Sequence, residues 1–331
     1  MTEQYKIDFV IPWVDGSDPA WLREKKKYMP ASDTDSSIAR YRDWDILKYW
    51  FRGIEKNAPW VNRIYFITWG HLPSWLNTDH PKLKIIRHED YIPKEYLPTF
   101  SSHTIELNLH RIEGLSEHFV YFNDDMYLIN PVTKDHFFHK GLPRGIAVFN
   151  PPTAPNDTMQ AILSNDIRLI NRHFDKNALV KKNLKMFLNP AYGKYNIRTL
   201  LCLPWTKLVG FFNHHTATRF LKSVFEEVWE REYDTLNDTS RNKFRSRADV
   251  NQYVFLYWQY CTGKFVPSKN PGKSVRIMDD IDKACEMIRS KKIKCLCLND
   301  SVTGEDMFDI ARVKIAQALE ERFPEKSEFE K

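Results

Sequence analysis

The chain has 331 residues, of which 42% are hydrophobic and 28% charged, and this balance excludes a largely disordered protein. Its 49 basic and 43 acidic residues leave a net charge of only +6, which predicts no general polyanion-binding surface. No zinc-finger, RNA-binding or basic-zipper signature is present, so we expect no nucleic-acid partner. A phosphate-bearing substrate or an anionic membrane surface would suit this mild positive charge.

The first 150 residues read as alternating strands and helices. Four β-rich stretches predict strands, at residues 6–14, 63–68, 83–86 and 119–122. Helical spacing of apolar residues predicts two helices, at residues 44–54 and 103–112, whereas residues 22–37 are polar, as in an exposed loop or a frayed helix. We therefore expect an α/β sheet with helices on its faces. In such sheets ligands bind outside the carboxyl ends of the strands.

Two acidic turns follow strands of this predicted sheet. Asp15 to Asp18 come after the first strand, and Asn123, Asp124 and Asp125 come after the fourth, so we expect both turns at one rim. Adjacent carboxylates are costly to bury unpaired, so the second turn either reaches solvent or holds Mg²⁺ or Mn²⁺. The first turn could offer its backbone amides to a diphosphate, although a plain surface turn is the commoner interpretation.

The second half of the chain changes character. Long amphipathic segments predict helices, at residues 157–174, 216–233 and 247–260. After a linker-like start at residue 266, the tail predicts a helix, a strand and a capped last helix, at residues 279–290, 294–298 and 304–322. These changes predict three parts: a nucleotide-sugar-binding α/β part, a helical part and a C-terminal segment that completes the catalytic domain, at residues 1–150, 151–265 and 266–331.

Two basic motifs precede the predicted helices of the second half. A histidine such as His215, with Arg219 four residues on, could remove a proton from an acceptor hydroxyl near neutral pH, although histidine pairs are more often structural. Ser246 and Asp249 have the form of a capping box, which would place Arg245 at a helix start and create a phosphate site. The alternative is that Asp249 is only a cap partner and Arg245 only a surface charge.

The cysteines and the termini bear on location. The five cysteines are odd in number and lack metal-ligand spacing, which favours buried thiols in a reducing compartment. The sequence starts in a strand pattern without a signal-peptide apolar region, and it has no apolar run of about 18 residues that would span a membrane. We therefore expect a cytoplasmic protein that can associate peripherally with the inner face of the cell membrane.

Four blocks of the sequence together resemble the Stealth family in order and spacing. They cover residues 7–19, 40–125, 215–260 and 297–300, and the second runs from Arg40-Tyr-Arg-Asp to Tyr121-Phe-Asn-Asp-Asp125. That family includes bacterial capsular and exopolysaccharide phosphotransferases and the catalytic subunit of the animal lysosomal-enzyme N-acetylglucosamine-1-phosphotransferase. The chain departs from the family pattern at Ile11-Pro12, Thr218 and Ser301.

The resemblance implies a fold and a reaction. The fold is a Rossmann-like core similar to glycosyltransferase-A enzymes, with a helical insertion. The reaction transfers a sugar 1-phosphate from a nucleotide-diphosphate sugar, such as UDP-N-acetylglucosamine, to a hydroxyl of a glycan or polysaccharide acceptor, with Mg²⁺ or Mn²⁺ as cofactor. It releases the nucleoside monophosphate, whereas the alternative, a metal-dependent glycosyltransferase, would release the diphosphate. A non-catalytic carbohydrate-binding protein would release neither.

The matched blocks also imply a set of site residues. The implied catalytic residues are His215 as base, Arg245 on the diphosphate, Arg219 and Asp124. The implied substrate contacts are Trp13, Asp15, Gly16, Asp18, Arg42, Ser101, Ser102, Asn123 and Asn299. The implied metal ligands are Asp125, Asp249 and Asp300.

Overall fold

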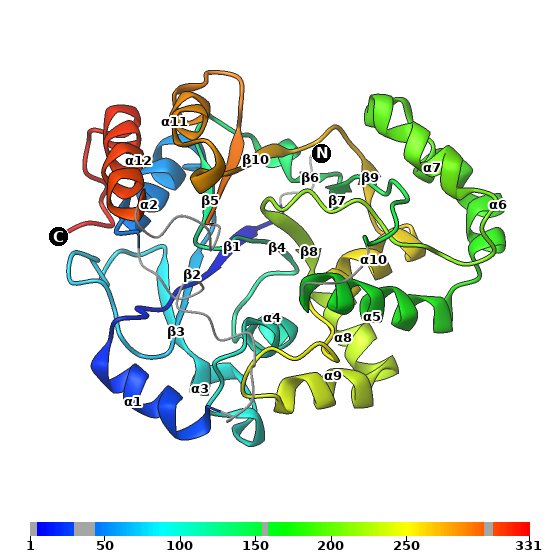
Figure 1. Cartoon of the computed structure of the whole chain (residues 1–331), viewed down its shortest axis with the longest axis horizontal. Helices are drawn as coiled ribbons and strands as arrows, with labels where there is room; N and C mark the ends of the chain where they lie inside the picture. The colour runs from blue at the N-terminus through cyan, green and yellow to red at the C-terminus, as the bar shows by residue number, and fades with distance from the viewer. Residues whose placement is uncertain (1–4, 30–43, 154–157, 301–306) are drawn as a thin grey trace.

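A five-stranded sheet forms the centre of the computed structural model, which describes residues 5–29, 44–153, 158–300 and 307–331. The strand order is β3-β2-β1-β4-β8 (Figure 1). The four expected strands are confirmed as β1 (Ile7–Pro12), β2 (Ile64–Thr68), β3 (Leu83–Arg87) and β4 (His118–Tyr121), all parallel. The fifth, β8 (Thr218–Leu221), pairs antiparallel with β4 at the edge. The expected α/β class is confirmed.

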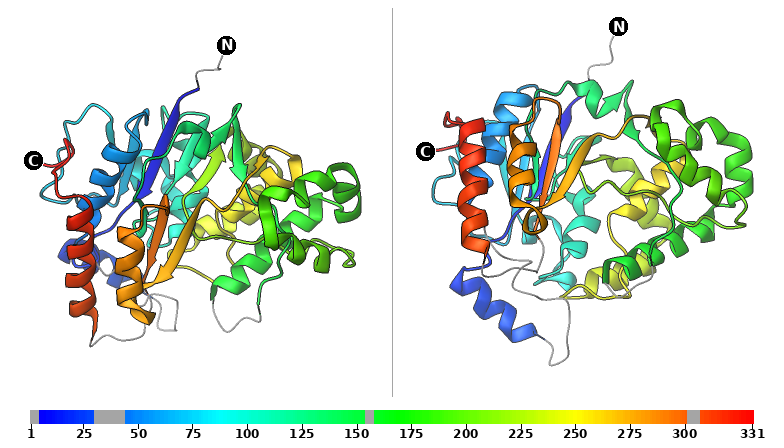
Figure 2. Two further views of the ribbon diagram at one scale, coloured as in Figure 1. Left: turned by 90° about the horizontal axis from the view of Figure 1, so that it is seen from above. Right: turned by 45° about the horizontal axis from the view of Figure 1, so that its top comes forward.

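Burial explains why the inner strands are almost uninterruptedly apolar. Every residue of β2 is buried, and so is every residue of β1 except Pro12. Such strands belong to parallel sheets that are covered on both faces. Helices α2 (Leu47–Asn57), α11 (Ile281–Arg289) and α12 (Phe308–Arg322) lie to one side of the sheet, and the helices of the middle of the chain lie to the other (Figure 2).

A second sheet joins the tail to the core. Its order is β10-β11-β5, with β10 (Gly272–Arg276) parallel and β5 (Met126–Leu128) antiparallel to β11 (Cys295–Asn299). Because β5 begins directly after Asp125, the acidic turn connects the two sheets. A smaller sheet contains β6 (Phe138–His139), β7 (Leu142–Gly145) and β9 (Val266–Pro267).

Helices fill much of residues 158–262, as expected. They are α5 (Thr158–His173), α6 (Lys176–Phe187), α7 (Asn196–Cys202), α8 (Lys222–Arg231), α9 (Tyr233–Arg241) and α10 (Tyr253–Thr262). In the first half, α1 (Pro19–Tyr28), α3 (His88–Tyr91) and α4 (Ser102–Leu107) complete the set, and a 3₁₀ turn follows α4 where one longer helix was predicted. Among the described residues, no helix is both long and apolar enough to cross a bilayer.

Two helix predictions were wrong in ways that affect the site. Residues 216–233 begin with β8 rather than with a helix, because Thr218 to Leu221 find backbone partners on β4. Residues 247–252 are also not helical, and α10 begins only at Tyr253. Consequently neither His215 nor Arg245 stands at the start of a helix. Arg42 and the predicted cap at residues 303–306 lie outside the described residues.

Candidate active site

The acidic turn lies at the carboxyl end of β4, beside the end of β1. The Phe122 amide donates to the Val10 carbonyl at 2.9 Å, which holds the start of the turn against β1. The turn that follows β1 carries Asp15 and Asp18 and therefore lies at the same edge of the sheet. Both acidic turns sit where a parallel α/β sheet binds its ligands.

Asp125 connects three distant segments of the chain. Its Oδ2 lies 3.4 Å from His215 Nε2 and accepts a hydrogen bond of 3.2 Å from Cys297 Sγ. Its carbonyl accepts a bond of 2.8 Å from the Leu298 amide. The other carboxylate oxygen, Oδ1, is buried and finds no hydrogen-bond partner among the residues that the structure describes. The sequence left a turn or a cation site open, and this turn has one buried carboxylate oxygen that is suited to a cation.

His215 has an unusual backbone and a shifted pKa. Its φ is +42°, in the left-handed region where residues other than glycine are uncommon and which is enriched at functional sites. Burial lowers its pKa, but the hydrogen bond and charge of Asp125, with the charge of Glu106, outweigh burial and raise it above the ordinary value. Nε2 faces Asp125, so Nδ1 is the ring nitrogen that is turned away from the carboxylate. This is the arrangement of a base oriented by a carboxylate.

Arg245 lies between α9 and α10 and contacts the start of α4. Its Nη2 donates to Ser102 Oγ at 2.6 Å, at the start of α4. The positive charge of Arg245 also lowers the pKa of His215, so the two side chains are close enough to interact electrostatically. Ser101 is fully buried, and within the described part of the chain its hydroxyl has no partner. Of the two predicted serines, Ser102 is therefore the one in contact with Arg245.

Asp249 is occupied in holding the loop that carries Arg245. It is fully buried, and its Oδ2 accepts bonds from His103 Nδ1 at 2.9 Å and from the Ser246 amide at 2.8 Å. Its Oδ1 accepts a bond of 2.7 Å from Asn242 Nδ2. Both oxygens are therefore engaged in a closed turn, where the sequence suggested a helix cap. We leave Asp249 out of the proposed metal ligands.

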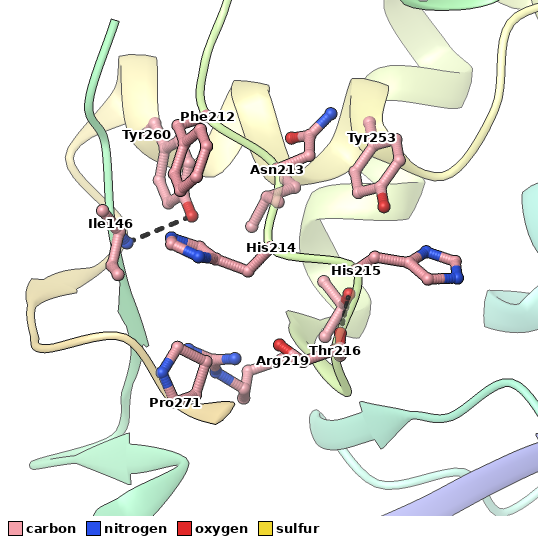
Figure 3. Close-up of a pocket in the computed structure, with 12 residues that line it drawn as sticks. Ile146, Phe212, Asn213, His214, His215, Thr216, Arg219, Tyr253, Tyr260 and Pro271 are labelled. Atoms are coloured by element: carbon pink, nitrogen blue, oxygen red, sulfur yellow. Dashed lines mark hydrogen bonds between the residues drawn. The ribbon is translucent and has the colours of Figure 1, made fainter. Parts of the chain in front are cut away.

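Residues 212–217, which precede β8 and which we call the histidine loop, separate the side chain of Arg219 from the ring of His215 (Figure 3). Arg219 is buried in β8, and its guanidinium donates to the carbonyls of Arg144 at 2.9 Å and Ala217 at 2.8 Å. Arg219 lines a pocket together with His214, Tyr260 and Ile146, and His215 also borders it, although its ring points away from these side chains (Figure 3). Burial, with the charge of Arg219, lowers the pKa of His214 to about 3. The two neighbouring histidines therefore have different environments, and His215 is the one beside Asp125.

The turn after β1 is held by its own polar groups. Asp15 Oδ1 accepts bonds from the Ser17 amide at 2.8 Å and hydroxyl at 2.6 Å, and Asp18 Oδ1 accepts 2.7 Å from the Trp21 amide and so caps α1. The Asp15 amide donates to His71 Nε2 at 2.7 Å. These contacts match the surface-turn interpretation of Asp15, Gly16 and Asp18, while leaving them at the rim of the sheet.

Trp13 and the tail complete the rim. Trp13 packs edge-on against His71, with ring centroids 5.3 Å apart. Asn299 ends β11, and Asp300 Oδ2 accepts 3.1 Å from Trp44 Nε1, which links the tail to the segment before α2. The tail therefore packs beside the segment before α2, and its place in the site stays a prediction.

Sequence reasoning missed two contributors to this site. Cys297 lies two residues before Asn299, and strand alternation would have placed both on one face of β11. Glu106 lies four residues after Ser102, so helix periodicity would have placed it on the side of α4 that faces the site. Both patterns were readable, but neither residue type attracts attention alone.

Asp125 is the residue best suited to hold a cation. It forms a cluster with His215 and Cys297 in which the potential ligand atoms all lie within 4.8 Å of one another. Mg²⁺ prefers oxygen ligands, and the partnerless buried Oδ1 of Asp125 fits that preference, whereas imidazole and thiol are softer donors. A divalent ion would therefore depend on Asp125 first, with further oxygens from the substrate phosphates.

Comparison with known proteins gives family matches along the chain. Stealth protein conserved region 1 matches residues 5–33, and conserved region 2 matches residues 40–144, which include the acidic turn. The capsular polysaccharide phosphotransferase WcwK of Streptococcus pneumoniae is 42% identical over 338 residues and covers 100% of both chains. The exopolysaccharide phosphotransferase cps2G of Lactiplantibacillus plantarum is 39% identical, over 99% of this chain and 97% of its own.

Another relative and one solved structure extend the comparison. The receptor polysaccharide phosphotransferase WefC of Streptococcus oralis is 37% identical over 98% of this chain and 99% of its own. The galactosyltransferase LgtC, solved with donor and acceptor sugar analogues, covers 92% of this chain and 95% of its own at 8% identity, with a TM-score of 0.39, from which we draw nothing further. The full-length relatives decide the matter: this protein is a phosphotransferase, and it belongs to the Stealth family.

Proposed function

We propose that the enzyme transfers a sugar 1-phosphate from a nucleotide-diphosphate sugar to a hydroxyl of a growing capsular polysaccharide or exopolysaccharide. The observation that carries this proposal is the meeting of Asp125 and His215 beside Arg245 in a chain whose full-length relatives are polysaccharide phosphotransferases. The family resemblance favours a uridine nucleotide and an N-acetylhexosamine or hexose. Cytoplasmic location, with work at the inner face of the membrane, is part of the proposal.

The bond that breaks is the phosphoanhydride, and the glycosidic bond stays intact. The acceptor oxygen attacks the phosphorus that carries the sugar, and its proton passes to His215. The bonding electrons leave with the nucleoside monophosphate, so a new phosphodiester joins the sugar to the acceptor. Charge builds up on the phosphate oxygens during this transfer, and fixed positive groups lower its energy.

The residues divide these tasks according to their places. Asp125 orients His215, which removes the acceptor proton. Arg245, held by Ser102, binds the diphosphate. Mg²⁺ or Mn²⁺, held through Asp125 with Asp124 and Asp300 as further oxygen donors, would neutralise phosphate charge. Arg219 is kept as a buried support of the histidine loop.

The remaining predicted contacts form the donor side of the site. Trp13, Asp15, Gly16 and Asp18 follow β1, Asn123 lies two residues after the end of β4, and Asn299 is the last residue of β11. Their amides and side chains would surround the nucleotide, and Arg42 belongs to the same predicted set.

The deciding experiment identifies the released nucleotide. The purified enzyme is incubated with Mg²⁺, a glycan acceptor and a panel of nucleotide-diphosphate sugars, and the products are separated chromatographically. Release of UMP with a phosphodiester-linked product supports the proposal. Release of UDP would instead assign the site to a glycosyltransferase. If the acceptor causes no nucleotide to be released from any donor of the panel, transfer from these donors is refuted.

A further inference from the structure

An apolar face lies exposed on α7 and the turn that follows it. Its members are Ile197, Leu200, Leu201 and Trp205, with 59%, 52%, 71% and 62% of their surface exposed, respectively. The first three recur at helical spacing and so share one side of α7, while Thr199 and Cys202 are buried. Large apolar side chains gathered in this way mark an interaction surface, and we call them the α7 face.

The segment around the α7 face carries positive charge only. From residue 176 to residue 225 the sequence has no Asp or Glu, although the chain has 43 acidic residues in 331. Several basic residues of this segment are exposed: Lys181, Lys182, Lys185, Lys194 and Lys207. An apolar centre with a tryptophan and surrounding lysines is the composition of elements that bind anionic lipid surfaces.

The α7 face is fixed in its outward position. Lys176 at the start of α6 is buried, and its ammonium group donates to the carbonyls of Cys202 at 3.0 Å and Leu203 at 2.6 Å, and to that of Trp205. These bonds satisfy carbonyls that a helix end leaves unpaired. The Asn171 side chain makes two further bonds to the backbone of Leu208, at 2.8 and 3.0 Å. The exposure of Trp205 is therefore built into the fold.

Contacts also connect α7 to the histidine loop. The Arg198 guanidinium lies over the Phe212 ring at 4.7 Å, and Phe212 packs edge-on against His214 at 4.5 Å, next to His215. His215 follows Trp205 by ten positions in the sequence, so the two lie within about 35 Å of each other. Figure 1 shows α6 and α7 at one edge of the molecule, away from β1 and β2.

We infer that the α7 face docks the enzyme on an anionic phospholipid bilayer. A second copy of the chain fits this surface less well, because a two-fold interface would bring two sets of lysines together. Docking by the α7 face would bring the histidine loop toward the membrane. This inference concerns binding alone and holds or fails independently of the proposed reaction.

Helix α12 offers a matched control surface. Its N-cap Met307 and its Ile310 and Val313 are also exposed, at 45%, 48% and 63%. Acidic and basic side chains alternate around them, with Asp309 next to Ile310 and Lys314 next to Val313. A general effect of exposed apolar residues would involve both helices, whereas the inference involves α7 only.

The test is co-sedimentation of the full chain with vesicles. Vesicles of equal parts phosphatidylcholine and phosphatidylglycerol should bind the protein, and vesicles of phosphatidylcholine alone should bind it much more weakly. Added salt should reduce the binding, because it screens the lysines. The double variant Leu201→Glu with Trp205→Ser should lose at least tenfold in affinity, and Val313→Glu should leave the affinity unchanged.

A charge variant tests the same surface without touching its apolar residues. Lys194→Gln and Lys207→Gln should each weaken binding by about fivefold, the effect of about 1 kcal/mol per basic residue. No binding to the anionic vesicles, or unchanged binding of the double variant, overturns the inference. So does a dimer in sedimentation that Leu201→Glu dissociates, since it assigns the face to a second copy. Nucleotide release with a water-soluble acceptor should stay unchanged in Leu201→Glu, which separates this test from that of the reaction.

Discussion

Asp249 provides the sharpest test of what holds the loop that carries Arg245. The sequence suggested a metal ligand, but the structure gives its carboxylate three hydrogen bonds, from His103, Ser246 and Asn242, at 2.7 to 2.9 Å. Asp249→Ala would remove the acceptor from all three donors, of which His103 is buried and the other two are half-buried. At about 1–1.5 kcal/mol for each of the three lost partners, we expect a loss of about 3–4.5 kcal/mol of unfolding free energy, a large part of the stability of an ordinary domain.

A second substitution at Asp249 distinguishes a role in supporting the loop from a role in binding metal. Asp249→Asn keeps the shape and an accepting oxygen, so it should cost about 1–2 kcal/mol in denaturant unfolding. If Asp249 only holds the loop, this variant should raise the KM for the donor, through displaced Arg245, and leave the Mg²⁺ concentration for half-maximal activity unchanged. Arg247→Ala, in the same loop, serves as the control for loop substitution. Wild-type stability together with a strongly increased Mg²⁺ requirement in Asp249→Asn would refute this interpretation.

Three further predictions concern the base, the arginine contact and acid stability. His215→Ala should lower kcat by about 10²–10⁴ with little change in donor binding, since general-base catalysis contributes on that scale; unchanged UMP release would disprove the base assignment. Ser102→Ala should reduce kcat/KM for the donor about tenfold by removing a charge-assisted bond to Arg245, whereas Ser101→Ala, which removes a partnerless hydroxyl, should not. Burial lowers the pKa of His88 to about 4, so between pH 6.5 and 4 the unfolded chain takes up a proton that the folded chain does not. The free energy of unfolding should therefore decrease by about 1.4 kcal/mol for each pH unit as the pH is lowered through that window. His88→Gln should remove this part of the pH dependence in unfolding titrations.

The sequence was informative where one rule of topology decides the geometry. The turns after β1 and β4 were placed at one edge because parallel strands end at the same side of a sheet, and the structure confirms the two strands as neighbours. The segment from residue 216 was misread because the buried Phe220, Val224 and Val228 continue at helical spacing across the junction of β8 and α8. Only pairing with β4, almost 100 residues earlier, makes its first part a strand.

The key contacts of the site were beyond local reasoning for a related reason. Asp125 and Cys297 are 172 positions apart, and His103 and Asp249 are 146 positions apart. No propensity or periodicity within a window indicates which distant partners will meet, and a buried aspartate with three donors looks in sequence like a helix cap. The family resemblance supplied His215 and Arg245 as site residues, whereas the geometry supplies the reason that Asp249 must accompany Arg245.

The contacts at Asp125 also bear on the three predicted parts of the chain. Asp125 comes from the first part, His215 from the second and Cys297 from the third, and the charge or hydrogen bonds of one carboxylate join them. β8 carries the second part into the central sheet, and β11 carries the third against β5. Each part therefore contributes a strand next to the acidic turn as well as a side chain to it. Removing the tail would expose β5 and take away the thiol of Cys297 and the amide of Leu298, which both bond to Asp125. The three parts therefore describe only the order of the sequence, because the site forms only when all of them fold together.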